Sequence, residues 1–373
     1  MIIGIPRERA ADENRVGLAP AGVHSLVEQG HQVAVERAAG VASGFTDDQY
    51  AEAGAQVVYS GDELYGRAGL IVKVLPPTPR EFDFIQPRQI IMAAMHLAVS
   101  EPDLLNLLID RQCTAIDYVT IQDEKGDLPV LRTMSQIAGR MVPQLAARYL
   151  QSDHGGMGIL LGGAPAVPPA EVVILGGGVV GRNAARACLG AGARVTLLDK
   201  DYERIRRLDW AFMGQMTTFI ANEYTLPKVL GYADVVIGAV LIPGARTPHL
   251  VTREMIRLLR DRSLILDISI DQGGCFETSR PTRLSDPTYV VDRITHFCVP
   301  NLPSLVARSA TYALGNITLP FVSALVGSEE VDVFRSNPTL SRGVNLYRGH
   351  VTHMQIAAAH EREYMPLEKL LAE

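Results

Sequence analysis

A glycine-rich turn between two apolar strands is the part of the chain whose residue types and spacing most clearly indicate chemistry. Residues 171–199 read EVVILGGGVVGRNAARACLGAGARVTLLD, with glycines at Gly176, Gly178 and Gly181 and an acid at Asp199. An apolar strand precedes the turn, an alanine-rich helix follows it, and a second apolar strand ends at the acid. This pattern predicts a dinucleotide-binding βαβ unit, because the turn admits a pyrophosphate and the helical N–H groups face its phosphates.

The carboxylate of Asp199 favours NAD over NADP as the dinucleotide. It can accept hydrogen bonds from the adenosine ribose hydroxyls, and it would repel a 2′-phosphate. Lys200 and Arg204 follow closely in the sequence and could partly neutralise this charge.

Polar residues that follow apolar runs are the candidates for the reaction, since ligands of open α/β sheets bind beyond the carboxyl ends of the strands. Asp271 directly follows the apolar run 264–270, which predicts a carboxylate at the mouth of the cofactor crevice. Asp267 lies inside that run, and we expect it to accept hydrogen bonds from backbone groups instead.

Three candidates lie in the first third of the chain. Lys73 lies within the apolar run 70–75, where an ammonium is costly to bury unless it meets an anion. His96 directly follows the apolar run 90–95. It could take part in the reaction, or it could equally be a core histidine whose hydrogen bonds are satisfied within the protein. Arg15 follows the first strand and could hold a carboxylate with its planar fork, or it could equally be a surface arginine.

Two domains are needed to position these residues. The chain has 373 residues, and single hydrophobic cores stop growing beyond roughly 250 to 300. Strand-like runs alternate with helical segments, which predicts parallel sheets formed by right-handed crossovers. The runs in the first third are 2–5, 32–36, 56–59, 70–75, 89–95 and 114–118.

The second domain is expected to complete a six-stranded sheet with strands near 217–220, 233–240, 263–270 and 296–299. A helical stretch from Leu302 to Leu325 would return the chain to the first domain, and residues 329–373 are expected to form helices and loops. The predicted fold is therefore α/β with two Rossmann-like domains and parallel sheets. The substrate domain is discontinuous and comprises 1–128 and 306–373, and the NAD domain comprises 129–305.

Composition argues against several classes of protein. The net charge is −6 with 20% charged residues, so no basic surplus points to nucleic acid. We expect the arginines in 204–207 and 257–262 to lie on solvated helix faces. The N-terminal residues do not resemble a signal peptide, and no apolar stretch is expected to reach the roughly 18 residues of a membrane span.

Cysteine and histidine usage indicates neither disulfides nor a metal. The four cysteines show no C-x-x-C pairing and are expected to be reduced core residues of a cytoplasmic protein. His350, His353 and His360 have no acidic or cysteine ligand positioned with them, so we interpret them as surface histidines and predict no metal.

Short motifs along nearly the whole chain resemble those of alanine dehydrogenases, and they occur in the family's order. They are GIPRE at 4–8, Asn14–Val16, Pro20–Val23, Ser43–Asp47, Val72–Val74, Met95–Ala98, Ala138–Arg140, the glycine turn and Ile270–Gly274. The same superfamily includes the nucleotide-binding subunit of proton-translocating transhydrogenase and the saccharopine enzymes. Length and spacing agree best with the alanine dehydrogenases.

The resemblance implies a role for each candidate. Arg15 and Lys73 match the residues that hold the substrate carboxylate and its carbonyl oxygen, and His96 and Asp271 match the acid–base pair. Asp199 matches the acid that binds the ribose. The predicted cofactor contacts are Ser135, Gly176, Gly178, Val179, Val180, Gly181, Asp199, Arg204, Val240, Leu241 and Asp271. The predicted substrate pocket adds Ala94, Met134, Asn301 and Leu302.

The sequence departs from the family pattern at a few positions. Ala94 stands where an aromatic residue usually precedes the histidine by two places, beside a pocket that fits a methyl side chain. The usual Asn-Met-Pro-Gly loop reads NLPS at 301–304, and Gln136 replaces a glutamate. These departures bear on the substrate more than on the reaction.

The sequence therefore predicts an NAD-dependent dehydrogenase that interconverts an L-2-amino acid, by default L-alanine, with its 2-oxo acid and ammonium. One alternative is the same chemistry on a larger amino acid, and another is a catalytically silent NAD-binding paralogue. Neither nucleic acid nor a membrane is an expected partner. The resemblance implies a homohexamer.

Overall fold

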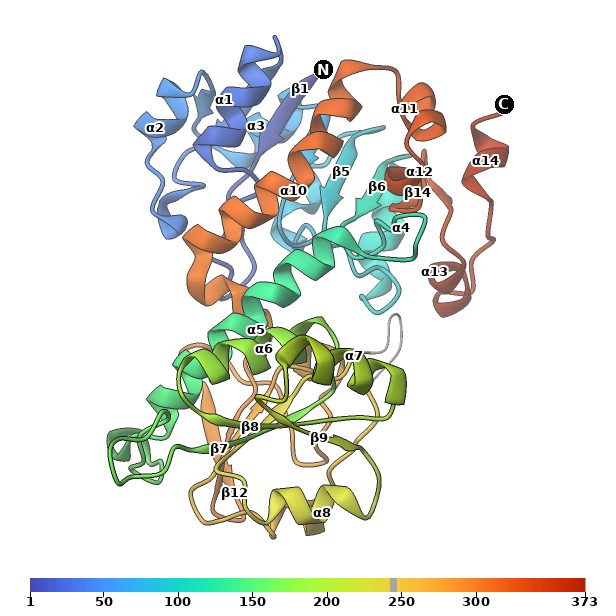
Figure 1. The fold of residues 1–373 in the computed structure, drawn as a ribbon. Helices are drawn as coiled ribbons and strands as arrows, with labels where there is room; N and C mark the ends of the chain where they lie inside the picture. Colours follow the sequence, from blue (N-terminus) through green and yellow to red (C-terminus); the bar gives the residue numbers. More distant parts are fainter. Residues whose placement is uncertain (242–246, 373) are drawn as a thin grey trace. The chain divides into compact units, whose positions relative to one another are not determined.

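The computed structural model describes residues 1–241 and 247–372. The chain divides into two compact units, each with its own sheet and flanking helices (Figure 1). Unit 1 comprises Met1–Met134 together with the chain from Pro303 onward, and unit 2 comprises Ser135–Leu302. The predicted α/β class with two domains is confirmed.

Within the described residues, unit 1 contains an eight-stranded sheet in the order β15-β14-β6-β5-β4-β1-β2-β3. Neighbouring strands from β1 to β6 pair in parallel, and every one of them lies in a predicted apolar run. The strands are β1 Ile2–Ile5, β2 Gln32–Glu36, β3 Gln56–Val58, β4 Leu70–Val72, β5 Ile90–Ala93, β6 Thr114–Asp117, β14 Val344–Tyr347 and β15 His350–Val351.

Strands β14 and β15 contradict the expectation of only helices and loops in 329–373. β14 pairs antiparallel with β6 and then with β15, so the sheet is mainly parallel with an antiparallel edge. A hairpin strand needs no helical crossover. The strand–helix alternation that predicted the other strands is therefore missing from this segment.

Alternate residues of the parallel strands face two separate layers of helices, as expected for strands whose side chains point in turn to opposite faces. Val72 and Met92 belong to a core with residues of α1 and α10, whereas Ile71 and Ile91 pack with residues of α3 and α4. The helices of unit 1 are α1 Pro20–Glu28, η1 Val41–Ser43, α2 Asp47–Glu52, α3 Gly61–Arg67, η2 Pro79–Phe84, α4 Pro102–Asp110, α10 Ala307–Gly327, α11 Glu330–Ser336, α12 Pro338–Ser341, α13 Met354–Ala359 and α14 Leu367–Leu370.

Helix α10 is an apolar core helix of unit 1. Among the described residues, the stretch Leu302–Gly327 is the one helix long and apolar enough to cross a membrane, with a mean hydropathy of 1.3. The expectation that no stretch reaches this length is therefore wrong. Leu314, Val322 and Leu325 are buried in the core that also holds β1 and β4, and this packing accounts for the apolar character of the helix.

In the part of the chain that the structure describes, unit 2 contains a seven-stranded sheet in the order β12-β13-β11-β10-β7-β8-β9. Six of its strands are parallel and correspond to the expected six, in the order typical of dinucleotide-binding sheets. The strands are β7 Glu171–Leu175, β8 Arg194–Asp199, β9 Thr217–Ile220, β10 Val235–Gly238, β11 Leu264–Asp267, β12 Thr288–Val291 and β13 Ile294–Phe297.

The seventh strand, β12, was not predicted. It forms an antiparallel hairpin with β13 at the sheet edge, and its Val290 is exposed, so it lacks the continuous apolar character of the buried strands. The helices that begin or lie in this half of the chain are α5 Pro129–Tyr149, η3 Ser152–His154, α6 Val179–Gly190, α7 Tyr202–Phe212, α8 Thr225–Leu230, α9 Arg253–Ile256, η4 Ile270–Gln272 and η5 Leu302–Val306.

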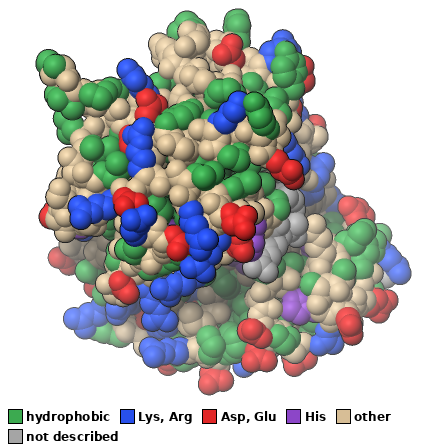
Figure 2. Space-filling view, turned by 90° about the horizontal axis from the view of Figure 1, so that it is seen from below, with side chains coloured by type: hydrophobic (Ala, Val, Ile, Leu, Met, Phe, Trp, Pro, Cys, Tyr) green, Lys and Arg blue, Asp and Glu red, His purple; other side chains and the backbone are tan. Residues whose placement is uncertain are grey.

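The cysteines and charges agree with the expectations from composition. All four cysteines are buried and unpaired, and burial raises the pKa of Cys113 to about 11. Arg257 and Arg260 form ion pairs with Asp292 and Asp234, so these arginines are not an unpaired basic patch. Figure 2 shows basic and acidic side chains interspersed on one face of the molecule.

Two of the three C-terminal histidines, His353 and His360, differ from the expectation of surface residues. His350 is exposed, but His353 is partly buried, and burial lowers its pKa. The Nε2 of His360 lies 2.7 Å from the carbonyl oxygen of Leu97. No group of three or more metal-ligating side chains occurs among the described residues.

Candidate active site

The glycine turn has the geometry that a pyrophosphate requires. Gly176 has a φ of 101°, in the left-handed region that favours glycine, and Gly178 forms the N-cap of α6. A Cβ on Gly181 would lie 1.8 Å from the carbonyl oxygen of Gly176, whereas a Cβ on Gly178 would meet nothing within 4 Å. The turn is thus tightly packed on the protein side and open at Gly178, where a phosphate can approach the first N–H groups of α6.

Asp199 ends β8 and is held next to this turn. Its Oδ2 accepts a hydrogen bond from the N–H of Gly177 at 2.7 Å and from Nη1 of Arg204 at 3.0 Å, and its Oδ1 accepts one from the N–H of Asp201 at 2.9 Å. Burial raises the pKa of Asp199, but the two backbone donors and Arg204 outweigh burial and bring it below the usual value. The carboxylate is therefore ionised at neutral pH. Arg204, one of the two cations expected to neutralise part of its charge, forms an ion pair with it.

Asp199→Ala should weaken NADH binding at least about tenfold, because charge-assisted hydrogen bonds contribute about 1.5–3 kcal/mol each. In the parent protein NADH should bind at least about tenfold more tightly than NADPH, and the substitution should narrow this difference. The measurement is titration of nicotinamide fluorescence with both dinucleotides. Asp201→Ala, which removes the neighbouring acid that caps α7, is the control and should keep the preference. Equal affinities in the parent protein would contradict the assignment.

Ser135 and Gly139 lie one turn apart on α5 and therefore share a helix face. A Cβ on Gly139 would lie 2.4 Å from the carbonyl oxygen of Val180, so this glycine lets α5 approach the first turn of α6 closely. The sequence motif at 138–140 thus has a packing reason that residue patterns alone did not provide. Ser135 is partly buried on α5.

Val240 and Leu241 follow β10 at the same edge of the sheet. The N–H of Val240 donates to Oγ of Ser269, and a Cβ on Gly176 would lie 3.2 Å from the Val240 side chain. Leu241 is exposed. The glycine turn, Asp199 and these residues therefore gather at the carboxyl ends of β7, β8 and β10.

Asp267, the last residue of β11, is a buried carboxylate that organises the following loop. It accepts hydrogen bonds from the N–H groups of Ser269 at 3.1 Å and Cys275 at 3.0 Å, and from Oγ of Ser279 at 2.6 Å. The expectation that Asp267 satisfies backbone groups is confirmed.

Asp271 lies within this loop rather than directly after the strand, which corrects the position expected from the sequence. The strand ends at Asp267, because the chain then turns into the short helix η4. Asp271 is exposed, and its Oδ1 accepts the N–H of Asn301 at 3.0 Å. Leu302, the next residue, is buried. Asp271, Asn301 and Leu302 are thus brought together in unit 2.

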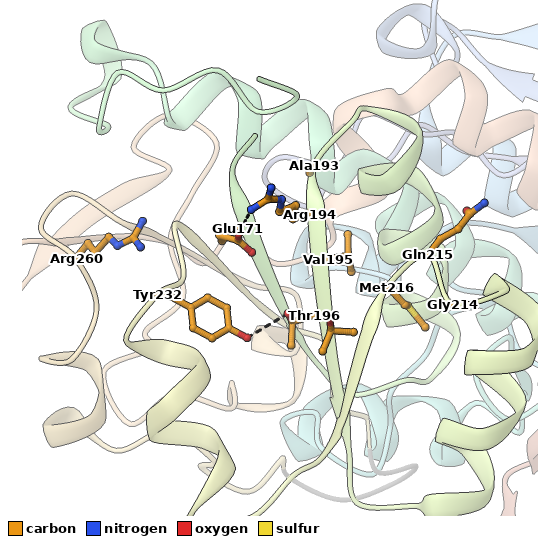
Figure 3. Close-up of a pocket in the computed structure, with 11 residues that line it drawn as sticks. Glu171, Ala193, Arg194, Val195, Thr196, Gly214, Gln215, Met216, Tyr232 and Arg260 are labelled. Atoms are coloured by element: carbon orange, nitrogen blue, oxygen red, sulfur yellow. Dashed lines mark hydrogen bonds and ion pairs between the residues drawn. The ribbon is translucent and has the colours of Figure 1, made fainter. Parts of the chain in front are cut away.

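A hollow at the opposite ends of β7 and β8 contains none of the predicted site residues (Figure 3). Glu171 and Arg194, the first residues of these strands, pair across it, and Tyr232 lies within hydrogen-bond distance of Thr196. Ligands of open α/β sheets bind at the carboxyl ends of the strands. The candidate site therefore lies at the edge with the glycine turn and not in this hollow.

Lys73 directly follows β4 and is fully buried between two carboxylates. Its Nζ lies 2.9 Å from Oε1 of Glu81 and 3.2 Å from Oε2 of Glu8, and Tyr65 donates a hydrogen bond to Glu81. Burial lowers the pKa of Lys73, but the two carboxylates outweigh it and raise the pKa above its ordinary value. The anion that a buried lysine needs is supplied by the protein itself, and Glu8 and Glu81 are partners that the sequence analysis missed.

Arg15 is buried, so the alternative of a surface arginine is wrong. Its Nε and Nη2 donate to the two carboxylate oxygens of Glu13 at 2.8 and 2.7 Å, and its Nη1 lies 3.4 Å from Sδ of Met134. This bidentate pair fixes the plane of the guanidinium. Met134 is thereby placed beside Arg15 in unit 1.

His96 is exposed, so the alternative of a satisfied core histidine is excluded. It lies just beyond β5 and has a φ of 49°, a conformation uncommon for a residue with a side chain. Arg15, Lys73 and His96 follow β1, β4 and β5, whose carboxyl ends lie at one edge of a parallel sheet.

Ala94 lies two residues before His96 and borders the same core as Met134. Met95 points to the other core of unit 1, on the opposite face of the sheet. Met95 therefore cannot fill space beside Ala94, whereas Met134 lies on the same side.

Comparison with known proteins identifies both halves of the chain. Residues 4–138 match the family described as "Alanine dehydrogenase/PNT, N-terminal domain", and residues 142–354 match the corresponding C-terminal domain.

Full-length relatives agree with these matches. The chain is 44% identical over 374 residues to a protein of Methanococcus maripaludis and 45% identical over 374 residues to one of Staphylococcus haemolyticus, both named alanine dehydrogenase, with 100% of each chain covered. A solved structure named L-alanine dehydrogenase is 40% identical, with a TM-score of 0.93 over 97% of this chain and 99% of the other.

Proposed function

The chain belongs to the alanine dehydrogenase/PNT family, and from this premise we propose that it converts L-alanine, NAD and water to pyruvate, ammonium, NADH and a proton, and the reverse. Its class is that of an NAD-dependent amino-acid dehydrogenase. The observation that carries the proposal is the conjunction of a glycine turn beside an ionised Asp199 in unit 2 with a buried Arg15 and Lys73 in unit 1. The turn suits a dinucleotide, and the two cations suit a 2-oxo acid.

The two cations have different tasks. The fixed plane of the Arg15 guanidinium suits the planar substrate carboxylate. Lys73 has three N–H donors, and its contacts with Glu8 and Glu81 account for two of them among the described residues. The third is available to polarise the carbonyl oxygen of the 2-oxo acid.

His96 and Asp271 move the protons. The glycine turn and Asp199 would hold NAD, which would supply a hydride acceptor for the Cα of the amino acid; loss of that hydride and of one proton from the ammonium group converts the substrate to an iminium. His96 and Asp271 then relay protons from the water that adds to the imine carbon and to the departing ammonia. Both side chains are exposed, as proton-transfer groups at a substrate site require.

The test in the oxidative direction is NADH formation from NAD with L-alanine. L-alanine should support turnover, with pyruvate as the product, whereas D-alanine should not. Absence of NADH formation with every L-amino acid of a panel, by a protein that still binds NADH, would instead favour a silent NAD-binding paralogue.

Ala94 supports a second candidate, a preference for amino acids larger than alanine. Where an aromatic ring would close the side-chain pocket, the methyl group of Ala94 leaves space on the side where Met134 lies. A hydrophobic pocket discriminates one methylene by about 1–3 kcal/mol, so removal of a ring can overturn the preference. Met134 can reduce this effect, because methionine adapts readily to gaps.

We expect 2-oxobutyrate and 2-oxovalerate to match or exceed pyruvate in kcat/KM for reductive amination. Ala94→Phe should restore a preference for pyruvate of about tenfold or more, because the ring refills the pocket. Met95→Leu is the control, since residue 95 points to the other core. A tenfold preference of the parent protein for pyruvate, unaltered by Ala94→Phe, would show that other side chains already fill the pocket.

The finer features follow from the resemblance. We propose a substrate domain of 1–128 and 306–373, an NAD domain of 129–305, and a homohexamer. We also propose that the enzyme acts in the cytoplasm, which the four unpaired buried cysteines support.

A further inference from the structure

Asp117, at the carboxyl end of β6, is a buried carboxylate that contacts the loop bearing His96. It is 1% exposed. Its Oδ1 accepts hydrogen bonds from the N–H groups of Met95 and Val119, each at 3.0 Å, and its Oδ2 accepts the N–H of His96 at 3.0 Å. One carboxylate thus binds two consecutive backbone N–H groups, one of them that of His96 itself.

The backbone at His96 needs such support. Its φ of 49° is in the left-handed region, which a residue with a Cβ adopts at a cost and keeps only where the surroundings determine it. The side chain itself is exposed, so core packing does not determine its direction. The hydrogen bonds from the N–H groups of Met95 and His96 to Asp117, together with the bond from the N–H of Val99 to the carbonyl oxygen of His96, hold the conformation from which the imidazole projects.

The second oxygen of Asp117 is itself oriented by the C-terminal part of the chain. Nδ2 of Asn345, on β14, donates to Oδ2 of Asp117 at 3.2 Å. Oγ1 of Thr120 lies 3.0 Å from Oδ1 of Asn345 and is also within hydrogen-bond distance of the carbonyl oxygens of Asp117 and Gly343. All four groups that hydrogen-bond to the carboxylate are N–H donors, which favour its ionised form, whereas burial raises the pKa of Asp117 above its ordinary value. An asparagine side chain at position 117 would place its N–H₂ group opposite two of these N–H donors, in place of a carboxylate oxygen that accepts from them.

We propose that Asp117 is a positioning residue for the reaction, which acts through the backbone of residues 95–96 to hold the His96 imidazole toward the substrate. The proposal rests on the proposed role of His96 in proton transfer. Asp117 itself touches neither substrate nor cofactor. Misplacement of a catalytic group by about 1 Å can cost about 100-fold in rate, so the loop conformation has a measurable consequence.

The first test is Asp117→Asn, a change that keeps shape and removes the acceptor from either His96 or Met95. We expect kcat for reductive amination to fall about 10- to 100-fold, with KM for pyruvate and Kd for NADH within about threefold of the parent values. In a His96→Ala background the same change should lower kcat by less than about threefold, because the loop then positions no imidazole. An equal loss in both backgrounds, or more than half of the parental kcat in Asp117→Asn, would overturn the proposal.

A paired variant separates positioning from stability and charge. The double variant Asp117→Asn/Asn345→Asp exchanges the two side chains that hydrogen-bond to each other. It keeps one carboxylate in the contact between positions 117 and 345, but the side chain that faces the backbone N–H groups of Met95 and His96 is now an amide. We expect Tm to recover toward the parent value while kcat stays at least about tenfold low. Full recovery of both would overturn the proposal, since charge and stability would then suffice. If Asp117→Asn alone fails to fold, this variant decides the question.

A matched control lies at the other end of β5. Gln89 is also buried, and its Nε2 donates to the carbonyl oxygens of Tyr65 and Ala68. Gln89→Ala should lower Tm and leave kcat within about twofold of the parent value. If Gln89→Ala lost as much kcat as Asp117→Asn, the effect of Asp117 would be explained by stability alone, which would overturn the positioning role. Parental turnover by His96→Ala alone would overturn the assignment of His96, and with it this proposal. A large loss in His96→Ala without one in Asp117→Asn would overturn only the positioning role.

Discussion

His96→Ala and Asp271→Asn should each lower turnover by roughly 100- to 10,000-fold, the usual contribution of a positioned general acid or base. Both residues lie beyond strand ends with exposed side chains, so their loss removes proton transfer without opening a core. Dissociation constants for NADH should therefore stay within about twofold of the parent value, and Tm should change little. The measurements are steady-state kinetics with pyruvate and ammonium, fluorescence titration with NADH, and thermal unfolding.

Two matched substitutions control for general effects. His350→Ala removes another exposed histidine, and Asp201→Asn removes another acid that follows a strand of unit 2. Both should leave turnover within about twofold. A His96 or Asp271 variant that keeps more than about a third of the parental rate would remove that residue from the mechanism.

Lys73→Met should abolish saturable binding of pyruvate and also destabilise unit 1. The substitution deletes the cation that neutralises two buried carboxylates, Glu8 and Glu81. Removal of one partner from a buried ion pair typically costs about 3–5 kcal/mol, so Tm should fall by several degrees. NADH binding should change little, because its predicted contacts lie in unit 2.

A second substitution separates substrate binding from stability. Glu81→Gln in the Lys73→Met background removes one of the unpaired charges and should recover part of the lost Tm without restoring pyruvate binding. Arg15→Met should likewise lose pyruvate binding, and it removes the guanidinium that pairs with Glu13. Saturation of Lys73→Met by pyruvate at parental concentrations would contradict the assignment of Lys73 to the substrate.

The parallel strands were predictable because each is an apolar run bounded by a helix. Val172–Leu175 and Leu264–Asp267 are buried along their whole length, and such runs are visible without knowledge of their neighbours. β12 is an exposed edge strand, and β14 lies between β6 and the edge strand β15; both pair antiparallel, so no crossover helix in the sequence indicates them.

The candidate residues could be named from the sequence, but their partners could not. Lys73 required an anion, yet nothing in the sequence says that it comes from both Glu8 and Glu81, because the pairing depends on how separate elements meet. Asp117 contacts Met95 and His96 through backbone N–H groups, which carry no side-chain signature. Glu13 lies only two residues before Arg15, but the sequence analysis did not identify it as the partner of Arg15 either.

The most direct test of the account is reductive amination with ¹⁵N-labelled ammonium, pyruvate and NADH, followed by mass spectrometry of the product. The account predicts NADH oxidation that depends on ammonium, with one ¹⁵N-labelled L-alanine formed per NADH consumed, and formation at least about 100-fold slower by His96→Ala. The 2-oxo acids with longer side chains should give the corresponding labelled amino acids. NADH oxidation independent of ammonium, or no oxidation with any 2-oxo acid by a protein that binds NADH, would contradict it.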